Sequence, residues 1–419
     1  MPPLCGGTEI IMNAVMYGAG NIGRGFIAQR FYLSGFHTTF IDVNESVVNA
    51  INERGRYPIH VTKGTKFEAE YVENVSAVNG RDEEAVVNTI AGCDIMATAL
   101  GVNILPFVAP LIAKAIVKRH KESGAPLNIL ICENLIGSNE YLCGLVKKYI
   151  PEEDEQYFND MVGFVCVCVG RTVPPTAPEF LEADSLAICA EPYSELPVDA
   201  KGFRPVGCEY PPILGLVPFS PFSYFIERKL LIHNMGHALM AYMGWLKGHK
   251  FIFEVACDGE IKYILTRALL ESSRALALRH GASLDDTLQF VEDLVVRFEN
   301  KLLVDSLDRV GRDPKRKLSK NDRLVGAFNC VRESGKIPAH IAVGIAAALL
   351  FDNPEDAAAV EISTFTKENG VKAALEKYCE ITADEDVAMI SEFYFMLKDG
   401  KPFAEFVEKL SSYKDAASH

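Results

Sequence analysis

Apolar runs bounded by turn residues recur through the first half of the chain. They predict buried strands at Asn13–Tyr17, Thr38–Val43, Asp94–Leu100, Leu127–Cys132 and Met161–Val169. Apolar residues at helical spacing lie between some of these runs, at Phe26–Leu33 and Pro106–Arg119. Continuous apolar strands that alternate with helices are typical of a parallel sheet covered on both faces. The first half is therefore predicted to be an α/β domain.

The periodicity becomes helical after a connector rich in proline and glycine. This connector, Pro192–Pro221, follows a short apolar run at Leu186–Glu191 and is expected to hold one or two edge strands. Helices are predicted at Tyr224–Leu246, Asp258–Arg279, Leu284–Phe298, His340–Phe351, Ala357–Lys367 and Asp384–Leu397. We therefore place an α/β domain with its connector at residues 12–215 and an α-helical domain at residues 216–419.

Composition and charge narrow the class of protein. Apolar residues make up 49% and charged residues 23% of the 419 residues, as in globular proteins. The net charge of −14 disfavours a nucleic-acid or anionic-membrane partner. No apolar run reaches the roughly 18 residues that a membrane helix needs. We expect a globular monomer or small homo-oligomer whose partner is a small molecule.

The eleven cysteines are scattered and form no Cys-x-x-Cys pair. Cys166 and Cys168 share a face of a predicted strand, so we interpret them as buried thiols and not as metal ligands. Free thiols fit a reducing cytoplasm. Residues 1–11 lack the basic start and apolar core of a signal peptide. We interpret them as a disordered leader or a start assigned too early, with Met12 as the true beginning.

A glycine-rich turn follows the first predicted strand. Residues 18–25 spell GAGNIGRG, which is G-x-G-x-x-G with a strand before it and a helix after it. The first glycine permits a tight turn, the second lets the backbone approach a pyrophosphate, and the third lets helix and strand pack closely. The phosphates would lie on the free amides of the helix N-terminus. The expected cofactor-binding residues here are Tyr17, Gly18, Ala19, Gly20, Asn21, Ile22, Gly23 and Arg24.

An aspartate ends the second predicted strand. Asp42 lies 22 residues after Gly20, where a carboxylate accepts hydrogen bonds from the ribose hydroxyls of an adenosine. It would repel a 2′-phosphate, so NAD is favoured over NADP. Ligands of such sheets lie at the carboxyl ends of the strands, which places Thr98 along the cofactor and Asn134 near the nicotinamide. The alternatives are a solvated strand end for Asp42 and a cap of the next helix for Asn134.

The predicted helix from Tyr224 carries Lys229, Asn234 and His237. A lysine can take the proton of an alcohol, and an amide and an imidazole can hold its oxygen. Asn234 and His237 share a helix face. Lys229 and Asn234 differ by about 140° on a regular helix, so the lysine must reach across or the helix must begin distorted. Spacing alone favours the alternative of a surface lysine and a core histidine. His233, between them, is interpreted as a packing residue or a support of the residues that contact substrate, with substrate contact as the alternative.

A basic segment stands out in this acidic chain. Between residues 309 and 323 it holds Arg309, Arg312, Lys315, Arg316, Lys317, Lys320 and Arg323. Guanidinium groups suit bidentate binding of phosphate or carboxylate. The alternative, which the sequence leaves open, is a solvated helix face paired with Asp308, Asp313 and Asp322.

These blocks together resemble the polyol-specific long-chain dehydrogenases, the mannitol dehydrogenase family. The resemblance runs from about Met12 to the C-terminus. It is carried by the glycine-rich turn, DVN at 42–44, CEN at 132–134, RTVPP at 171–175, ERKLLIHNMGHA at 227–238, RFEN at 297–300 and RVGRDPKRKL at 309–318. The K-x4-N-x2-H spacing within residues 229–237 is specific to the family. Within the family, the chain is most similar to members that act on mannitol 1-phosphate.

The resemblance implies a Rossmann-type NAD-binding domain followed by a mostly α-helical catalytic domain. It also implies metal-independent, NAD-dependent interconversion of mannitol 1-phosphate and fructose 6-phosphate. By this resemblance, Lys229 would be the general base. Asn134 and Asn234 would form the oxyanion hole, and His237 would orient the substrate hydroxyl. A base must be uncharged near neutral pH, which burial in a cleft favours. The substrate phosphate would be bound by Arg312, Arg316 and Lys317.

The exact substrate stays open at the level of sequence. Gly170 stands where relatives carry an acidic residue, which is a departure from the family pattern. Within the family, the alternatives are a reductase of tagaturonate or fructuronate and a free-polyol 2-dehydrogenase. A non-catalytic NAD-sensing protein on the same fold is disfavoured, because the lysine, both asparagines and the histidine are all present.

Overall fold

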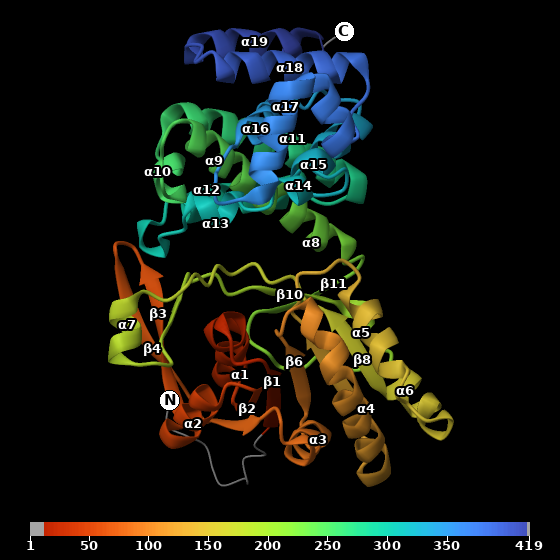
Figure 1. The fold of residues 1–419 in the computed structure, drawn as a ribbon. Helices are drawn as coiled ribbons and strands as arrows, with labels where there is room; N and C mark the ends of the chain where they lie inside the picture. The colour runs from red at the N-terminus through yellow and green to blue at the C-terminus, as the bar shows by residue number, and fades with distance from the viewer. Residues whose placement is uncertain (1–11, 417–419) are drawn as a thin grey trace. The chain divides into compact units, whose positions relative to one another are not determined.

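The computed structural model describes residues 12–416, so the leader expected at residues 1–11 lies outside the described residues. The chain divides into two units, Met1–Ser223 (unit 1) and Tyr224–His419 (unit 2). Unit 1 alternates strands and helices, whereas unit 2 is helical (Figure 1). Within residues 12–416, no helix is long and apolar enough to cross a membrane.

A six-stranded sheet forms the centre of unit 1. Its strand order is β5-β2-β1-β6-β7-β8, and every neighbouring pair is parallel. The bounds are β1 Met12–Tyr17, β2 Phe36–Asp42, β5 Val75–Asn79, β6 Ile95–Thr98, β7 Leu127–Ile131 and β8 Val162–Cys166. This is the Rossmann order, in which the chain crosses from one half of the sheet to the other beside β1. The strands predicted from apolar runs are confirmed, with bounds that differ by a few residues.

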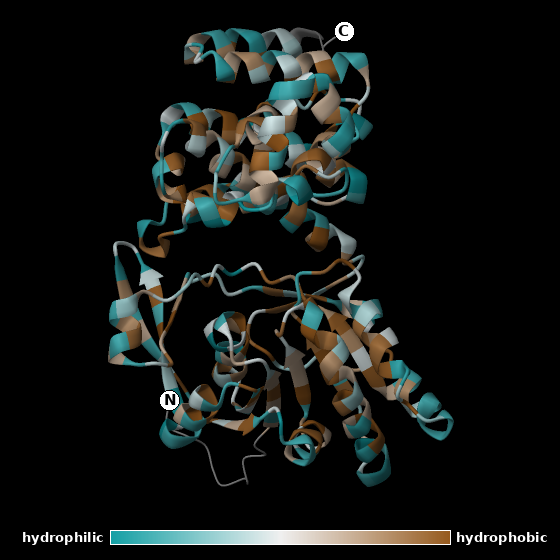
Figure 2. Cartoon of the chain, viewed as in Figure 1, coloured by the Kyte–Doolittle hydropathy of each residue, from teal (hydrophilic) through white to brown (hydrophobic). Residues whose placement is uncertain are grey.

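Alternate side chains of β1 enter two separate cores. Ala14 and Met16 lie in the core that also holds residues of α1 and α2, whereas Val15 and Tyr17 lie in the core of α3 to α6. Because both faces of the sheet are covered, its strands are continuously apolar and not alternating. Figure 2 shows hydrophilic residues at the free ends of α4 and α6. The helices are α1 Ala28–Leu33, α2 Glu45–Arg54, α3 Glu83–Ala91, α4 Leu105–Glu122, α5 Ser138–Lys147 and α6 Glu155–Met161.

Two small sheets complete unit 1. An antiparallel hairpin of β3 (Arg56–Lys63) and β4 (Lys66–Glu73) is extended by β9 (Ile188–Ala190), which pairs with β3. The hairpin was not predicted, because β4 is mostly exposed and carries charged residues at alternate positions. β9, in the apolar run that opens the connector, is thus an edge strand as expected, and the rest of the connector forms a separate pair, β10 (Leu196–Asp199) with β11 (Leu216–Phe219).

Unit 2 is built around a helix that is almost entirely buried. This helix, α16, packs against α9, α11 and α18. The main helices are α8 Ser223–Arg228, α9 Met235–Leu246, α11 Gly259–His280, α12 Leu284–Phe298, α15 Arg323–Glu333, α16 Ala339–Leu350, α17 Ala357–Ala374, α18 Asp384–Lys398 and α19 Phe403–Ala416. Shorter helices are α10 Ile252–Ala256, α13 Leu307–Gly311 and α14 Pro314–Lys317. All six predicted helices are present, but the first contains an irregular turn, described below.

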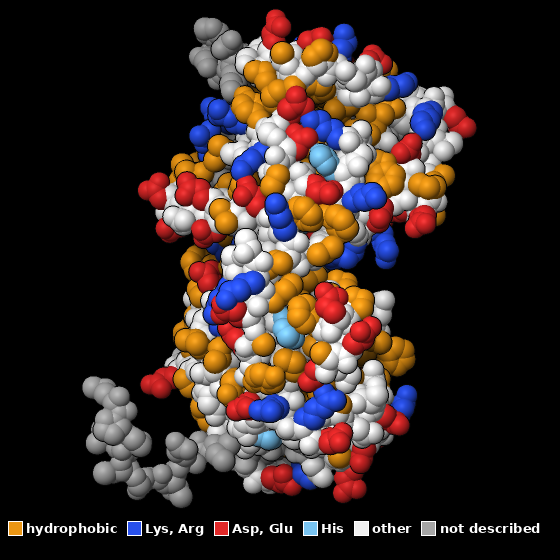
Figure 3. All heavy atoms as spheres, turned by 90° about the vertical axis from the view of Figure 1, so that its left-hand side faces the viewer, with side chains coloured by type: hydrophobic (Ala, Val, Ile, Leu, Met, Phe, Trp, Pro, Cys, Tyr) orange, Lys and Arg blue, Asp and Glu red, His pale blue; other side chains and the backbone are white. Residues whose placement is uncertain are grey.

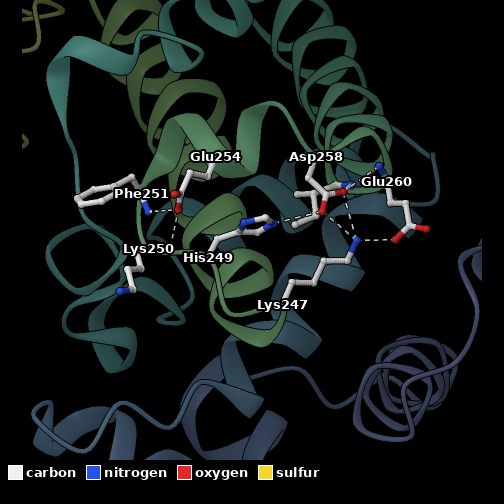
Figure 4. A network of polar contacts seen from close by, with 8 residues as sticks. Lys247, His249, Lys250, Phe251, Glu254, Asp258 and Glu260 are labelled. Carbon is white, nitrogen blue, oxygen red and sulfur yellow. Dashed lines mark hydrogen bonds and ion pairs between the residues drawn. The ribbon is translucent and has the colours of Figure 1, made fainter.

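A polar network fixes the C-terminal end of α9 (Figure 4). Asp258 caps α11 by accepting hydrogen bonds from the backbone N–H groups of Glu260 and Ile261, at 3.0 and 3.1 Å. The same carboxylate accepts from Lys247 Nζ at 3.0 Å and lies 3.2 Å from His249 Nε2. The end of α9 is therefore tied to the start of α11.

Candidate functional site

The three glycines of the glycine-rich turn meet different surroundings. Gly18 has φ +106°, and a Cβ there would lie 2.6 Å from the carbonyl oxygen of Ala99. A Cβ on Gly23 would lie 2.0 Å from the carbonyl oxygen of Gly18, so the helix and the turn touch through bare backbone. A Cβ on Gly20 would meet no atom within 4 Å. The turn therefore has open space at its second glycine, where a ligand can approach the backbone.

The carboxylate of Asp42 closes this turn onto the end of β2. Its Oδ2 accepts a hydrogen bond from Ala19 N at 2.7 Å and its Oδ1 accepts one from Asn44 N at 2.9 Å. Asp42 is therefore not a free, solvated strand end. Burial, and then the charge of Asp42, raise the pKa of Tyr17 to about 12, which keeps this phenol neutral.

Thr98, at the end of β6, is held by a buried carboxylate. Its hydroxyl donates to Glu133 Oε2 at 2.7 Å, and Glu133 Oε1 accepts from Leu100 N at 2.9 Å. Glu133 is only 6% exposed. We did not predict this role for Glu133. The available signal was a carboxylate directly after a continuous apolar strand.

Arg24 is buried in the fold of unit 1. Its Nε donates to the carbonyl of Ala19 at 2.7 Å, and its Nη1 donates to the carbonyl of Leu186. Burial lowers the pKa of its guanidinium, against the opposing effects of Tyr57 and nearby carboxylates. The charged end of Arg24 is thus engaged by backbone carbonyls of unit 1, whereas Asn21 is exposed at the turn.

Asn134 lies exposed just after β7. It does not cap the next helix: the residue before α5 is Gly137, and no side chain caps that helix. This excludes the capping alternative. Among the described residues, no hydrogen-bond partner is found for the carboxamide of Asn134.

The segment with Lys229 and Asn234 is a π-helical turn, Lys229–Asn234, inserted between α8 and α9. A π-helix closes i→i+5 hydrogen bonds, so residues five apart stack on one face. Lys229 and Asn234 are five apart, which removes the 140° misalignment of a regular helix. His237 follows Asn234 by three residues on α9 and shares its face. Of the two expected alternatives, a lysine that reaches across and a helix that begins distorted, the structure has the distorted helix.

The imidazole of His237 is held by neighbours within unit 2. Its Nε2 lies 3.2 Å from Asp305 Oδ2. Its ring stacks on Phe298, with centroids 5.3 Å apart and planes at 28°. His233 lies behind it, 5.9 Å between ring centroids. Burial holds the pKa of His233 well below its usual range, and the nearby basic groups, Arg297 foremost, lower it further. His233 is therefore a neutral, buried neighbour, as its interpretation as a packing residue expects.

The basic segment is divided between paired and unpaired cations. Arg316 contacts Asp313 at 3.1 Å and Asp322 at 3.5 Å, and Arg309, Lys315, Lys320 and Arg323 also pair with carboxylates. Arg312 is exposed and Lys317 is only 4% exposed, and neither has an ion pair among the described residues. Burial, followed by the charges of Arg323 and Arg316, lowers the pKa of Lys317 to about 7. Acidic and basic side chains are also interspersed on the face drawn in Figure 3.

A cavity of about 470 Å³ lies elsewhere in unit 2, between α11, α15, α16 and α19. None of the predicted site residues lines it, so it does not guide the choice of site. In the described part of the chain, no group of three or more His, Cys, Asp or Glu residues is arranged to hold a metal ion. Cys166 and Cys168 are both buried, as predicted.

Two family models cover most of the chain. The mannitol dehydrogenase Rossmann domain matches residues 12–206, and the mannitol dehydrogenase C-terminal domain matches residues 222–412. The chain belongs to the mannitol dehydrogenase family. The family expected from the motifs is thereby confirmed, and with it the order of a Rossmann domain followed by a helical one.

Curated members of the mannitol dehydrogenase family match almost end to end. Mannitol-1-phosphate 5-dehydrogenase of Anoxybacillus flavithermus is 37% identical over 380 residues, covering 90% of this chain and 98% of the relative. The enzyme of the same name from Geobacillus thermodenitrificans is 37% identical over 392 residues, covering 93% and 100%. That from Buchnera aphidicola is 35% identical over 391 residues, covering 93% and 100%. The chain is accordingly an oxidoreductase of the polyol dehydrogenase class.

Two solved structures share the fold at low sequence identity. Pseudomonas fluorescens mannitol 2-dehydrogenase, solved as a ternary complex with NAD and D-mannitol, has a TM-score of 0.70 at 16% identity, covering 96% of this chain and 94% of that one. A substrate-free D-sorbitol dehydrogenase has a TM-score of 0.76 at 15% identity, covering 93% and 94%.

Proposed function

We propose that this polyol dehydrogenase interconverts mannitol 1-phosphate and fructose 6-phosphate with NAD. The observation that carries the proposal is the π-turn at Lys229–Asn234, which aligns an amine with an amide, beside an imidazole, in a chain whose end-to-end relatives are named for this reaction. The open backbone at Gly20 and the carboxylate of Asp42 support NAD as the cofactor. When bound, NAD accepts the hydride from the alcohol carbon.

In the proposed reaction, different side chains act on different atoms of the alcohol. Lys229, as an uncharged amine, takes the hydroxyl proton while the carbon loses its hydride, so a carbonyl forms. Asn234 and Asn134 donate hydrogen bonds from their amides to the oxygen as negative charge develops on it. Each of these hydrogen bonds stabilises the transition state by about 3 kcal/mol. His237 orients a substrate hydroxyl. We propose that NAD is contacted by residues 17–24, by Asp42 and by Thr98.

The proposed phosphate site rests on the unpaired cations of the basic segment. Lys317 is buried and has no ion pair among residues 12–416, and burial with the charges of Arg323 and Arg316 outweighs the effect of Asp313 and Asp322 on its pKa. A phosphate group would supply negative charge there. Arg312 is exposed and makes no ion pair with any residue that the structure describes, and Arg316 would have to share its guanidinium with Asp313 and Asp322. Within this set, we assign the main role to Lys317 and Arg312.

The base is tested by Lys229→Ala and Lys229→Arg. Both should lower kcat by about 10²- to 10⁴-fold, because neither side chain can take the proton near neutral pH. NADH binding, measured by fluorescence titration, should be unchanged. Turnover by the alanine variant equal to that of the wild type would exclude Lys229 as the base.

The substrate is tested by comparing fructose 6-phosphate, free fructose and tagaturonate with NADH. Fructose 6-phosphate should give the highest kcat/KM. Lys317→Met and Arg312→Ala should raise its KM, while Lys320→Ala, in the same segment but paired with Glu380, should not. Equal reduction of free fructose would contradict the phosphate site, and preference for tagaturonate would identify a uronate reductase.

A further inference from the structure

Asp305 contacts the imidazole of His237 and determines which ring nitrogen can accept a hydrogen bond. It lies in the loop before α13, 7% exposed, and its backbone carbonyl accepts a hydrogen bond from Ile252 N at 2.9 Å. The two residues that follow it are tied to the segment before α10, by a β-bridge between Phe251 and Ser306 and a hydrogen bond from Leu307 N to the carbonyl of Lys250 at 2.9 Å. The position of the Asp305 carboxylate is therefore set by backbone pairing and not by a mobile loop.

Arg309 holds this carboxylate with two hydrogen bonds. Its Nε donates to Asp305 Oδ1 at 2.7 Å and its Nη2 donates to Oδ2 at 2.6 Å. Burial by itself would raise the pKa of Asp305, but the hydrogen bonds from His237 and Arg309 outweigh it and lower the pKa. Asp305 is thus an ionised, acceptor-only group on both oxygens.

An acceptor-only partner fixes the tautomer of a neutral imidazole. Since Asp305 Oδ2 can only accept, Nε2 of His237 must carry the hydrogen. Nδ1 then keeps its lone pair, and it has no hydrogen-bond partner among the residues that the structure describes. The stacked ring of Phe298 and the ring of His233 prevent the imidazole from turning freely. The ring is held with an acceptor ready for a ligand.

We infer that Asp305 is a positioning residue that holds His237 as the Nε2–H tautomer, so that Nδ1 accepts a hydrogen bond from a hydroxyl of the polyol substrate. Arg309 supports it by keeping Asp305 ionised and in place. This inference rests on the proposed function, because it assigns the substrate hydroxyl to His237. The same arrangement restricts the substrate. Nδ1 can accept a hydrogen bond from a hydroxyl group but cannot donate one to a carbonyl oxygen, so a substrate with a hydroxyl at this position is favoured.

Replacing Asp305 by asparagine should reverse the tautomer. Arg309 would keep the one remaining oxygen, so the carboxamide NH₂ would face His237 and donate to Nε2. The ring hydrogen would move to Nδ1, which could no longer accept. Losing one buried hydrogen bond should lower kcat/KM for the sugar by about 10- to 100-fold. The affinity for NADH should not change, since the proposed cofactor residues are all in unit 1.

The experiment is ¹⁵N NMR of the full chain labelled at histidine, with the signals of His237 assigned by their loss in His237→Gln. The wild type should show a protonated Nε2 and an unprotonated Nδ1, and Asp305→Asn should show the reverse. Asp308→Asn is the matched control: it removes a carboxylate from the same segment, which bonds Asn353 and not His237. It should leave both the tautomer and kcat/KM unchanged.

Each result decides the inference separately from the proposed function. A wild type protonated at Nδ1 would overturn the inference whatever the enzyme's substrate. So would an Asp305→Asn variant that reverses the tautomer but keeps full kcat/KM. If no sugar is reduced by the wild type, the proposed function fails, while the NMR result still reports whether Asp305 sets the tautomer.

Discussion

Gly20 and Gly23 belong to the same turn but meet opposite constraints. A Cβ on Gly20 would enter open space, and a Cβ on Gly23 would collide with backbone at 2.0 Å. We predict that Gly20→Ala folds normally but binds NADH at least about ten-fold more weakly, because a methyl group would occupy the space of the pyrophosphate. Gly23→Ala should cost at least about 1–3 kcal/mol of folding free energy, since the collision is with backbone that cannot turn aside.

Urea unfolding and NADH fluorescence titration separate these two effects. Asn21→Ala, an exposed neighbour in the same turn, serves as the control for stability. Unchanged NADH affinity in Gly20→Ala would remove this turn from the cofactor site. An unchanged unfolding midpoint in Gly23→Ala would contradict the close packing of helix and turn.

The buried Lys317 should make the free energy of unfolding depend on pH between pH 7 and pH 10. Its pKa is lowered to about 7 in the folded protein, from 10.5 in the unfolded chain. Between those values, the unfolded chain holds a proton that the folded protein has lost, so stability rises with pH, by about 1.4 kcal/mol per pH unit at most. Lys317→Met removes this group. The difference in unfolding free energy between wild type and variant should therefore shift in favour of the wild type from pH 7 to pH 10.

Urea unfolding at several pH values measures this difference, and Lys320→Met is the control at an exposed, paired lysine. A difference that stays constant from pH 7 to pH 10 would show that Lys317 keeps its ordinary pKa in the folded protein. That result would also weaken its assignment as the buried cation that lacks a counter-charge.

At the scale of elements, the end of α9 depends on the cap of α11. Asp258 both caps α11 and binds Lys247 and His249 (Figure 4). Asparagine caps helices as well as aspartate does but cannot form the ion pairs. We predict that Asp258→Ala destabilises the protein by about 1 kcal/mol more than Asp258→Asn. Chemical denaturation of both variants measures the two contributions separately.

The pH dependence of the wild type provides a second test of this network. The backbone hydrogen bonds and ion pairs at Asp258 lower its pKa despite burial. This contribution is present above the unfolded pKa and is lost as pH falls through the folded value. Asp258→Asn should therefore lose less stability than the wild type on acidification. Equal losses in both proteins would contradict the role of the charge.

At the scale of the whole molecule, the proposed cofactor residues all belong to unit 1. NADH at 100 times its Kd should stabilise unit 1 by about 2.7 kcal/mol. Hydrogen exchange followed by peptide mass spectrometry can measure this by unit. We predict stronger protection in β1, β2 and β6 on NADH addition, and unchanged protection in α16, the buried centre of unit 2. Protection of α16 without protection of β1 would contradict the location of the site.

Much of this protein was predictable from sequence because its signals are local. Continuous apolar runs, the spacing of the glycines and the Asp42 position depend on neighbours along the chain, and they specified a Rossmann sheet and its candidate cofactor turn. The hairpin β3–β4 was missed because β4 is polar and largely exposed and carries little local signal, and because β3 is stabilised by pairing with distant β9. The same spacing rules predicted that, if Lys229 and Asn234 act together, either the lysine reaches across the helix from Tyr224 or that helix is distorted.

Only the tertiary structure decided which side chains meet. Glu133 binds Thr98 and Asp305 binds His237 through contacts between residues 35 and 68 positions apart, which no local spacing predicts. The basic segment shows the same limit, because its composition could not separate the paired Arg316 from the buried, unpaired Lys317. Sequence determined the elements and the chemistry they carry, since both are set within a few residues. Folding determined the protonation states and the partners, since these depend on burial and on charges brought together from distant parts of the chain.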